Sequence, residues 1–294
     1  GGSAYSRAWD FKRFREIAYG NHPFARVFPT EEMLRGFTVA RVREFHAKQI
    51  GAKRAHLYVS GVFNAAAVEK AVRDAFGSWT AGAPPTENPP VPVARRQLEL
   101  IDRPGAVQSS MWMGLPVANP TSSDWTAMQV TDALLGGAFG SRITSNIRED
   151  KGYTYSPFSF LWTRKGSSLW VEVADVTTKD TGNSLTEIFK EMERLRTEAP
   201  PAKELDGIKN NMAGVFTIQN SSRSGLIGQL QFADLHGLGD DYLGTYVKKV
   251  LAVTPEDVRG TAQKHLDPAR VSVAIVGDKK VVEPQLGQFK PIVP

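Results

Sequence analysis

An internal repeat constrains the fold of this chain more than any other sequence feature. Residues 38–61, "TVARVREFHAKQIGAKRAHLYVSG", align without a gap to residues 254–277, "TPEDVRGTAQKHLDPARVSVAIVG". Both copies predict a threonine that caps a helix, an amphipathic helix, a short loop and an apolar strand that ends at a glycine. The expected strands are His56–Ser60 and Val271–Val276. Duplication is the favoured interpretation, although helix–loop–strand units also recur without common ancestry. The identical matched positions are Thr38/Thr254, Val42/Val258, Arg43/Arg259, Lys48/Lys264, Arg54/Arg270 and Gly61/Gly277.

The two copies differ in what precedes them. Only 37 residues precede the first copy, whereas the second follows a long segment whose first strand begins near Gln97. A duplication therefore implies that the chain starts inside its first domain. Between the copies, the segment "TAGAPPTENPPVPVARRQ" has five prolines and no hydrophobic periodicity, which is typical of a semi-rigid extended linker. We expect residues 1–79 to be the C-terminal half of a first repeat, residues 80–97 a linker, and residues 98–294 a complete second repeat.

Strand patterns come early in the second repeat and helix patterns come late. Residues 97–117 predict a hairpin whose two strands meet at a tight turn at Pro104-Gly105. A helix over residues 123–137 and strands through residues 158–175 follow, and then two amphipathic helices. Their apolar faces are Leu185, Ile188, Phe189, Met192 and Leu195, then Leu205, Ile208, Met212, Val215 and Phe216. The predicted fold class is α+β, with two homologous helix-on-sheet sandwich domains, a largely antiparallel sheet and a truncated first domain.

Composition excludes several classes of protein. The chain has no cysteine, so it has no disulfides, no thiolate catalysis and no cysteine-based zinc site. It has no run of 18 apolar residues, so we expect no membrane span. The formal net charge is +5, but basic and acidic residues are interleaved, so no nucleic-acid partner is expected. The compartment stays open between periplasm and cytoplasm.

The usual catalytic motifs are absent. None of the five histidines belongs to an H-E-x-x-H or H-x-x-E-H pattern. Asp234, His236, Asp240 and Asp241 in "ADLHGLGDD" have ligand chemistry, but the glycines favour a polar loop that ends a helix. The glycines of "LLGGAFGSR" lack the lysine of a phosphate-binding loop, and Ser141 lacks a nucleophile elbow.

The stretch "GGAFGSRITSNIREDKGYTYSPFS", residues 136–159, is the most unusual one. We expect a short helix from about Arg142 to Asp150, ended by Gly152 in the left-handed conformation. Arg148 lies about 100° around this helix from the preceding apolar residue, off the buried face, and so can face a cleft. Tyr153, Tyr155 and Pro157 would then share one side of an extended strand. The structural alternative is a cation at a helix C-terminus beside a half-buried tyrosine.

Several spaced motifs in this order resemble the insulinase-like (pitrilysin) zinc metallopeptidase family, in particular its zinc-free repeats. The similarity covers most of the chain, including "TVARVREFHAKQIGAKRAHLYVSGVF" and "AVRDAFGSW". The matching elements are Asp102-Arg103-Pro104-Gly105 with Gln108-Ser109, Leu135-Gly136-Gly137 with Ser141-Arg142, and Arg148-Glu149 with Tyr155.

The resemblance implies two homologous α+β domains that close around an extended peptide. The first holds zinc through H-x-x-E-H and a distal glutamate, and the second contributes an arginine and a tyrosine seven residues apart. By this resemblance, Arg148 would bind backbone carbonyls of the substrate, and the Tyr155 hydroxyl would donate to the scissile carbonyl as it becomes an oxyanion. A nearby sheet edge could hold the peptide by strand addition.

The chain departs from the catalytic members because no inverted zinc motif occurs in it. Zinc is then expected in a missing first half or in a homologous partner subunit, unless the first repeat is degenerate. We therefore expect a substrate-binding, zinc-free portion of a metalloendopeptidase, without cofactor and inactive alone. The alternative is a noncatalytic scaffold or peptide-binding subunit of a larger complex.

Overall fold

Two compact units make up the chain. The computed structural model describes the backbone of residues 2–289 and 292–293 and the side chains of residues 8–289. The first, here called the sheet unit, comprises Gly1–Val27, Pro89–Thr217 and His236–Pro294. The second, the small unit, comprises Phe28–Asn88 and Ile218–Leu235. The proline-rich residues 80–94, all of them described, contain neither helix nor strand.

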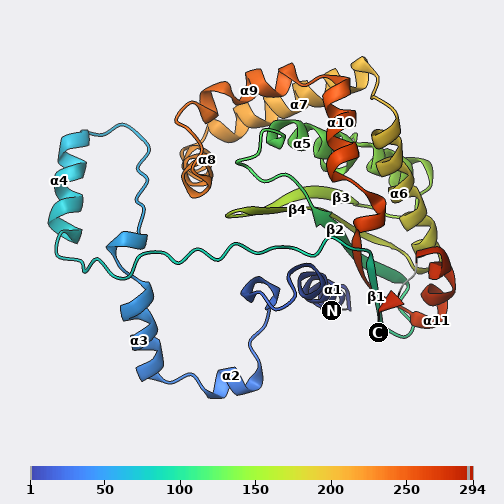
Figure 1. Ribbon diagram of the computed structural model, residues 1–294, viewed down its shortest axis with the longest axis horizontal. Coiled ribbons are helices and arrows are strands. Elements are labelled where there is room, and N and C mark those ends of the chain that lie inside the picture. Colours follow the sequence, from blue (N-terminus) through green and yellow to red (C-terminus); the bar gives the residue numbers. More distant parts are fainter. Residues whose placement is uncertain (1, 290–291, 294) are drawn as a thin grey trace. The chain divides into compact units, whose positions relative to one another are not determined.

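A mixed sheet forms the centre of the sheet unit (Figure 1). Across the described residues it has six strands in the order β3-β4-β2-β5-β1-β6. The pairs β3/β4, β4/β2 and β2/β5 are antiparallel, whereas β5/β1 and β1/β6 are parallel. The strands are β1 (Gln97–Asp102), β2 (Gln108–Pro116), β3 (Phe158–Arg164), β4 (Ser167–Thr177), β5 (Ser272–Gly277) and β6 (Ile292–Val293).

The predicted hairpin between β1 and β2 is wrong. The tight turn is present, since Gly105 has φ +72° and the Ala106 N–H donates to the Arg103 carbonyl at 3.2 Å. The two strands are nevertheless not paired, because β5 lies between them. Every residue of β5 is buried, so it needs a strand on each side. A partner from near the end of the chain leaves no mark on the local pattern that predicts a hairpin.

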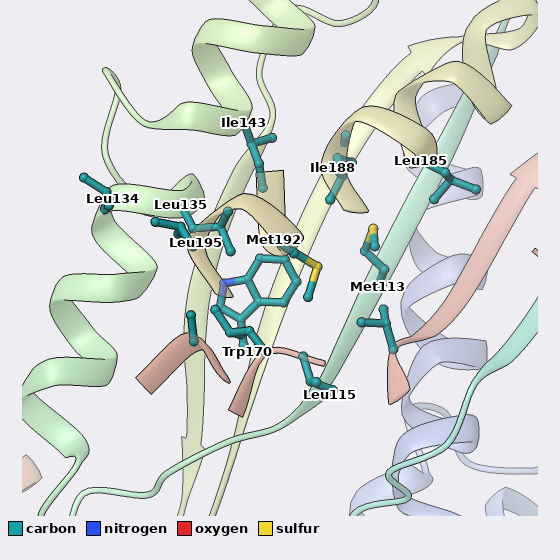
Figure 2. Packing of buried hydrophobic residues seen from close by; sticks show 14 of the residues in the cluster. Met113, Leu115, Leu134, Leu135, Ile143, Trp170, Leu185, Ile188, Met192 and Leu195 are labelled. Atoms are coloured by element: carbon teal, nitrogen blue, oxygen red, sulfur yellow. The ribbon is translucent and has the colours of Figure 1, made fainter. Parts of the chain in front are cut away.

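Helices cover one face of the sheet and enclose the main core (Figure 1). The α6 residues Leu185, Ile188, Met192 and Leu195 are fully buried there, as their periodicity predicts. Figure 2 shows these side chains around Trp170 of β4, together with Met113 and Leu115 of β2. The helices of the sheet unit on this side include α5 (Trp125–Asp132), α6 (Thr181–Thr197), α7 (Ala202–Asn220), α9 (Tyr242–Ala252), α10 (Pro255–His265) and α11 (Lys279–Val282). The 3₁₀ segments of the sheet unit, on either face, are η1 (Pro23–Ala25), η5 (Thr178–Asp180), η6 (Pro268–Arg270) and η7 (Glu283–Phe289).

The opposite face of the sheet is covered by α1 (Gly2–Tyr19). Phe14 and Ile17 pack there against Leu169 and other buried side chains of the strands. An ion pair of 2.5 Å between Arg13 and Glu99 ties the helix to β1. Helices therefore flank the sheet on both faces, which buries alternate residues of β4 in two separate cores.

The small unit contains α2 (Glu31–Arg35), α3 (Val39–Gln49), η2 (Ala52–Arg54), α4 (Ala65–Phe76) and most of α8 (Arg223–His236). Threonine caps α3 as it caps α10, with Thr38 accepting from the Arg41 N–H and Thr254 from the Asp257 N–H. The expected strand His56–Ser60 is wrong, because no residue of the small unit, all of which are described, lies in a strand. A strand needs hydrogen-bonding neighbours, and this unit has no sheet.

Candidate functional site

The predicted helix from Arg142 to Asp150 is confirmed, with an unexpected winding. Its last seven residues, Thr144–Asp150, form the π-helix η4, a form that is rare and often found at functional sites. Gly152, at φ +65°, ends it, and its N–H donates to the Arg148 carbonyl at 3.1 Å. Ile143 and Ile147 are fully buried, whereas the Arg148 side chain remains one quarter exposed. The backbone therefore directs Arg148 away from the core.

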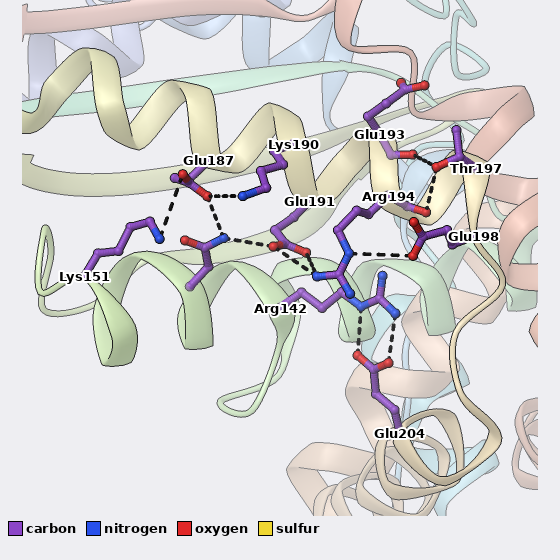
Figure 3. Close-up of polar contacts among 11 residues, drawn as sticks. Arg142, Lys151, Glu187, Lys190, Glu191, Glu193, Arg194, Thr197, Glu198 and Glu204 are labelled. Atoms are coloured by element: carbon purple, nitrogen blue, oxygen red, sulfur yellow. Dashed lines mark hydrogen bonds and ion pairs between the residues drawn. The ribbon is translucent and has the colours of Figure 1, made fainter.

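A polar network fixes this helix to its neighbours (Figure 3). Arg142 donates two hydrogen bonds of 2.8 Å to the carboxylate of Glu204 on α7. The side-chain amide of Asn146 donates to Glu187 at 2.9 Å and to Glu191 at 2.8 Å, both on α6. These bonds attach successive turns of the helix to α6 and α7. The position of Arg148 is thus set by partners on the opposite side of its helix, of which Glu191 is buried and Glu187 and Glu204 are partly exposed.

The segment after Gly152 differs from the prediction. Residues 153–157 belong to no strand, and only Thr154 forms a single β-bridge, with Val176. Tyr153 packs against the main core, whereas Tyr155 is 80% exposed. One bridge does not hold the regular pleat that would place both tyrosines on one side. Regular pairing starts only with Phe158, the first residue of β3.

Arg148 and Tyr155 lie side by side at a pocket. The Arg148 guanidinium carbon is 5.2 Å from the centroid of the Tyr155 ring and 4.7 Å from that of Phe139. Its Nε also pairs with Glu149 at 3.2 Å. The pocket has a volume of about 390 Å³. Its lining includes Arg148, Tyr155, Phe139, Phe158, Thr144 and the Gly136-Gly137 pair.

Gly136 forms a wall of this pocket, and there is no room for a larger residue at this position. A Cβ atom at this position would lie 2.6 Å from Ser159 Oγ and 2.7 Å from a carboxyl oxygen of Glu172. Gly136 is the penultimate residue of the π-helical segment η3 (Ala133–Gly137), which continues α5. Only a glycine lets this backbone approach β3 and β4 so closely.

Two buried carboxyl groups lie behind this wall, and sequence reasoning missed both. Ser159 donates a hydrogen bond of 2.5 Å to Asp132, and Glu172 has no hydrogen-bond partner among the described residues. Desolvation by burial raises the pKa of Asp132 to about 7, although the bond from Ser159 opposes the shift. Desolvation, followed by the nearby charge of Asp132, raises the pKa of Glu172 well above its usual range. The available signal was an acidic residue inside the apolar strand "WVEVAD".

No metal site is evident in the described part of the chain, where no three histidine, aspartate or glutamate side chains converge. The "ADLHGLGDD" loop therefore has no support as a ligand set. Within the small unit, His56 pairs instead with Asp234 at 2.6 Å. The described helices also include none that is long and apolar enough to span a bilayer.

Comparison with known proteins places these features in a family. Residues 36–212 match the sequence profile of the family described as "Peptidase M16 inactive domain". Because the match covers more than half of the chain, the chain belongs to this family, and the resemblance to insulinase-like metallopeptidases is confirmed. An uncharacterized zinc protease of Streptomyces coelicolor is 23% identical over 275 residues, which cover 91% of this chain and 60% of that protein. The chain thus spans about 60% of this curated relative.

Solved structures share the fold. A peptidase M16 inactive domain from Pseudomonas fluorescens superposes with a TM-score of 0.84 at 21% identity, covering 94% of this chain and 68% of that one. A chain of complex III2 from Candida albicans superposes with a TM-score of 0.81 at 13% identity, covering 98% and 73%. The α+β prediction is therefore confirmed as the fold of the M16 inactive domain.

Proposed function

We propose that this chain is the substrate-binding, zinc-free portion of an M16 zinc metalloendopeptidase. The observation that carries the proposal is the contact between Arg148 and Tyr155 in a pocket that both residues line. The exposed phenol and the guanidinium are two hydrogen-bond donors that can reach one bound chain. Family membership supports the same role, because the curated relative is named a zinc protease.

The substrate is proposed to be an extended peptide that adds to the edge of the sheet. β3 is the outermost strand on its side, so one of its edges has no strand partner among the described residues. Phe158 both begins β3 and lines the pocket. A peptide paired with β3 would therefore run directly into the space beside Arg148 and Tyr155. Main-chain pairing of this kind tolerates many side chains.

In the proposed chemistry this chain supplies hydrogen bonds. Arg148 donates to a backbone carbonyl of the peptide and holds it in register. The Tyr155 hydroxyl donates to the scissile carbonyl oxygen, and this bond strengthens as negative charge develops there. A zinc ion supplies water activation and carbonyl polarisation when bound in an enzyme of this class. The described residues offer no ligand set for zinc, so that step is assigned to another half or subunit.

The small unit is proposed to be part of a first repeat that requires a sheet from elsewhere. Apolar residues of the first copy are exposed where their counterparts in the second copy are buried. Ile50 is 44% exposed and Leu57 is 63% exposed, whereas their matched residues are fully buried. The matched pairs are Val42/Val258, Ile50/Leu266, Leu57/Val273 and Val59/Ile275. We propose that the zinc-bearing half, or a homologous partner chain, covers this apolar face.

Reconstitution tests the proposed function. The chain is mixed with the zinc-bearing portion of its own protein, and cleavage of an internally quenched peptide is followed. We expect hydrolysis only from the mixture, since neither part holds the complete site. A mixture that associates but hydrolyses nothing contradicts the protease proposal.

That last outcome favours a second candidate, a noncatalytic scaffold or peptide-binding subunit. The observation in its favour is the shared fold with a chain of complex III2 from Candida albicans. A scaffold needs the association of the parts but not the Arg148–Tyr155 contact. Arg148→Ala should then leave the assembly intact.

A further inference from the structure

The Arg148 guanidinium lies against two aromatic rings. Its central carbon is 4.7 Å from the ring centroid of Phe139 and 5.2 Å from that of Tyr155. Both distances are within the range in which a cation is attracted to an aromatic ring. Phe139 is 76% exposed in the loop between Gly137 and Arg142, so burial does not explain its position.

Phe139 has no other apparent structural role. Among the described residues, Phe139 belongs to neither hydrophobic core, and its ring contacts no other aromatic ring. An exposed phenylalanine that lies outside both cores and against a cation is consistent with a role exerted through that cation. This separates it from Phe158, which lines the same pocket but stacks on Phe160 at 5.6 Å.

Holding Arg148 by rings has a chemical consequence. Arg142, on the same helix, donates hydrogen bonds from its Nε and from one terminal nitrogen to Glu204. Arg148 pairs through Nε alone, with Glu149, and its terminal nitrogens have no hydrogen-bond partner among the described residues. A ring contact uses the face of the guanidinium and leaves its in-plane N–H donors available. The arrangement orders the cation without consuming those donors.

We propose that Phe139 is a positioning residue that acts together with Tyr155 to fix the Arg148 guanidinium for a peptide carbonyl. An arginine side chain has many rotamers, and an unrestrained one loses that freedom when it binds. The rings remove part of that loss in advance. We call the contact of the Arg148 guanidinium with the rings of Phe139 and Tyr155 the clamp. The binding of a peptide carbonyl by Arg148 rests on the proposed function, whereas the clamp itself does not.

The clamp is tested first without any peptide. The Arg148 Nε–H resonance of the full chain, assigned by its absence in Arg148→Lys, is compared among Phe139→Leu, Phe139→Trp and Phe158→Leu. We expect Phe139→Leu to reduce the ring-current displacement of this resonance to the part that Tyr155 contributes, and Phe139→Trp and Phe158→Leu to retain the full displacement. An unchanged resonance in Phe139→Leu overturns the proposal.

The consequence for binding is tested by a double-mutant cycle. The probe is a fluorescein-labelled peptide of alternating threonine and valine, and affinity is measured by fluorescence polarisation. Phe139→Leu should weaken binding about two- to fivefold, the effect of an exposed cation–ring contact, and should have no effect in an Arg148→Met background. Equal weakening in both backgrounds means that Phe139 contacts the peptide itself, which overturns the positioning role. If no variant binds the peptide while the resonance responds as expected, the proposed function fails and the clamp stands.

Discussion

The hydroxyl of Ser159 donates a 2.5 Å hydrogen bond to the carboxyl group of Asp132, immediately behind the Gly136 wall of the pocket. The side chains of Ser159 and Trp170 both lower the pKa of Asp132, but desolvation by burial outweighs them, and no cation among the described residues contributes. Burial therefore favours the protonated form of the carboxyl groups behind this wall over the ionised form.

Stability should consequently fall as the pH rises towards neutrality. The pKa of Asp132 is about 7 in the folded chain, above its unfolded value near 4, so the folded state binds more protons between these values. This contribution is complete below about pH 4 and is lost as the pH rises through about 7. Its upper limit is about 4 kcal/mol, and Glu172 acts in the same direction.

Urea unfolding between about pH 5 and pH 8 measures this loss. The window lies above the range in which ordinary carboxylates titrate, but histidines also titrate within it. The share of the buried pair is therefore the difference in slope between the wild-type chain and a variant that lacks one of its carboxyl groups. In Asp132→Asn, which keeps an acceptor for Ser159, the slope should be smaller. A wild-type chain whose unfolding free energy is constant across the window contradicts the assignment.

Gly136→Ala should destabilise the fold by about 1–3 kcal/mol, the usual cost of overpacking. The added methyl group would lie 2.6 Å from Ser159 Oγ, closer than van der Waals contact allows. The matched control is Gly140→Ala, because a Cβ atom there meets nothing within 4 Å. Thermal unfolding of both variants checks the prediction, and equal melting temperatures would show that the wall is not tightly packed.

Glu204→Ala should cost about 1–3 kcal/mol, because it leaves the buried guanidinium of Arg142 without its carboxylate. The control is Lys70→Ala, which removes an exposed i,i+4 pair with Asp74 and should cost less than about 0.5 kcal/mol. Denaturant unfolding measures both changes. A loss no larger than that of the control would mean that this pair does not anchor the helix that carries Arg148.

The repeat predicts opposite responses at matched positions. Leu266→Ala should cost about 2–5 kcal/mol, since Leu266 is fully buried. Ile50→Ala should cost about 0.5 kcal/mol or less in this chain, where Ile50 is exposed. Ile50→Ala should instead weaken association with the zinc-bearing portion, measured by titration calorimetry. An association constant unaffected by Ile50→Ala removes the support for a covered face.

Local signals in the sequence predicted local structure well. The helix that carries Arg148, its end at Gly152 and the buried face of α6 all follow from short-range spacing and from one left-handed glycine. The cap of α10 follows in the same way from Thr254, which forms the full capping box with Asp257. These features depend on contacts a few residues apart.

Features that depend on distant partners could not be predicted. β5 separates β1 from β2 because a strand from the end of the chain inserts there, and residues 56–60 have strand-like composition but no strand beside them. The contact of Arg148 with Tyr155 lies between these cases. Their spacing suggested the pair, but the irregular path of residues 153–157, not a pleated strand, brings the Tyr155 ring to Arg148.

The most direct test of the account is the kcat of the reconstituted enzyme with Tyr155→Phe. Tyr153→Phe is the matched control, because Tyr153 packs against the core and does not line the pocket. The account predicts a kcat about a hundred- to a thousandfold lower for Tyr155→Phe, the usual effect of losing a donor to an oxyanion, and little change for the control. A kcat unchanged by both Tyr155→Phe and Arg148→Ala would contradict the proposal that these two side chains stabilise the transition state.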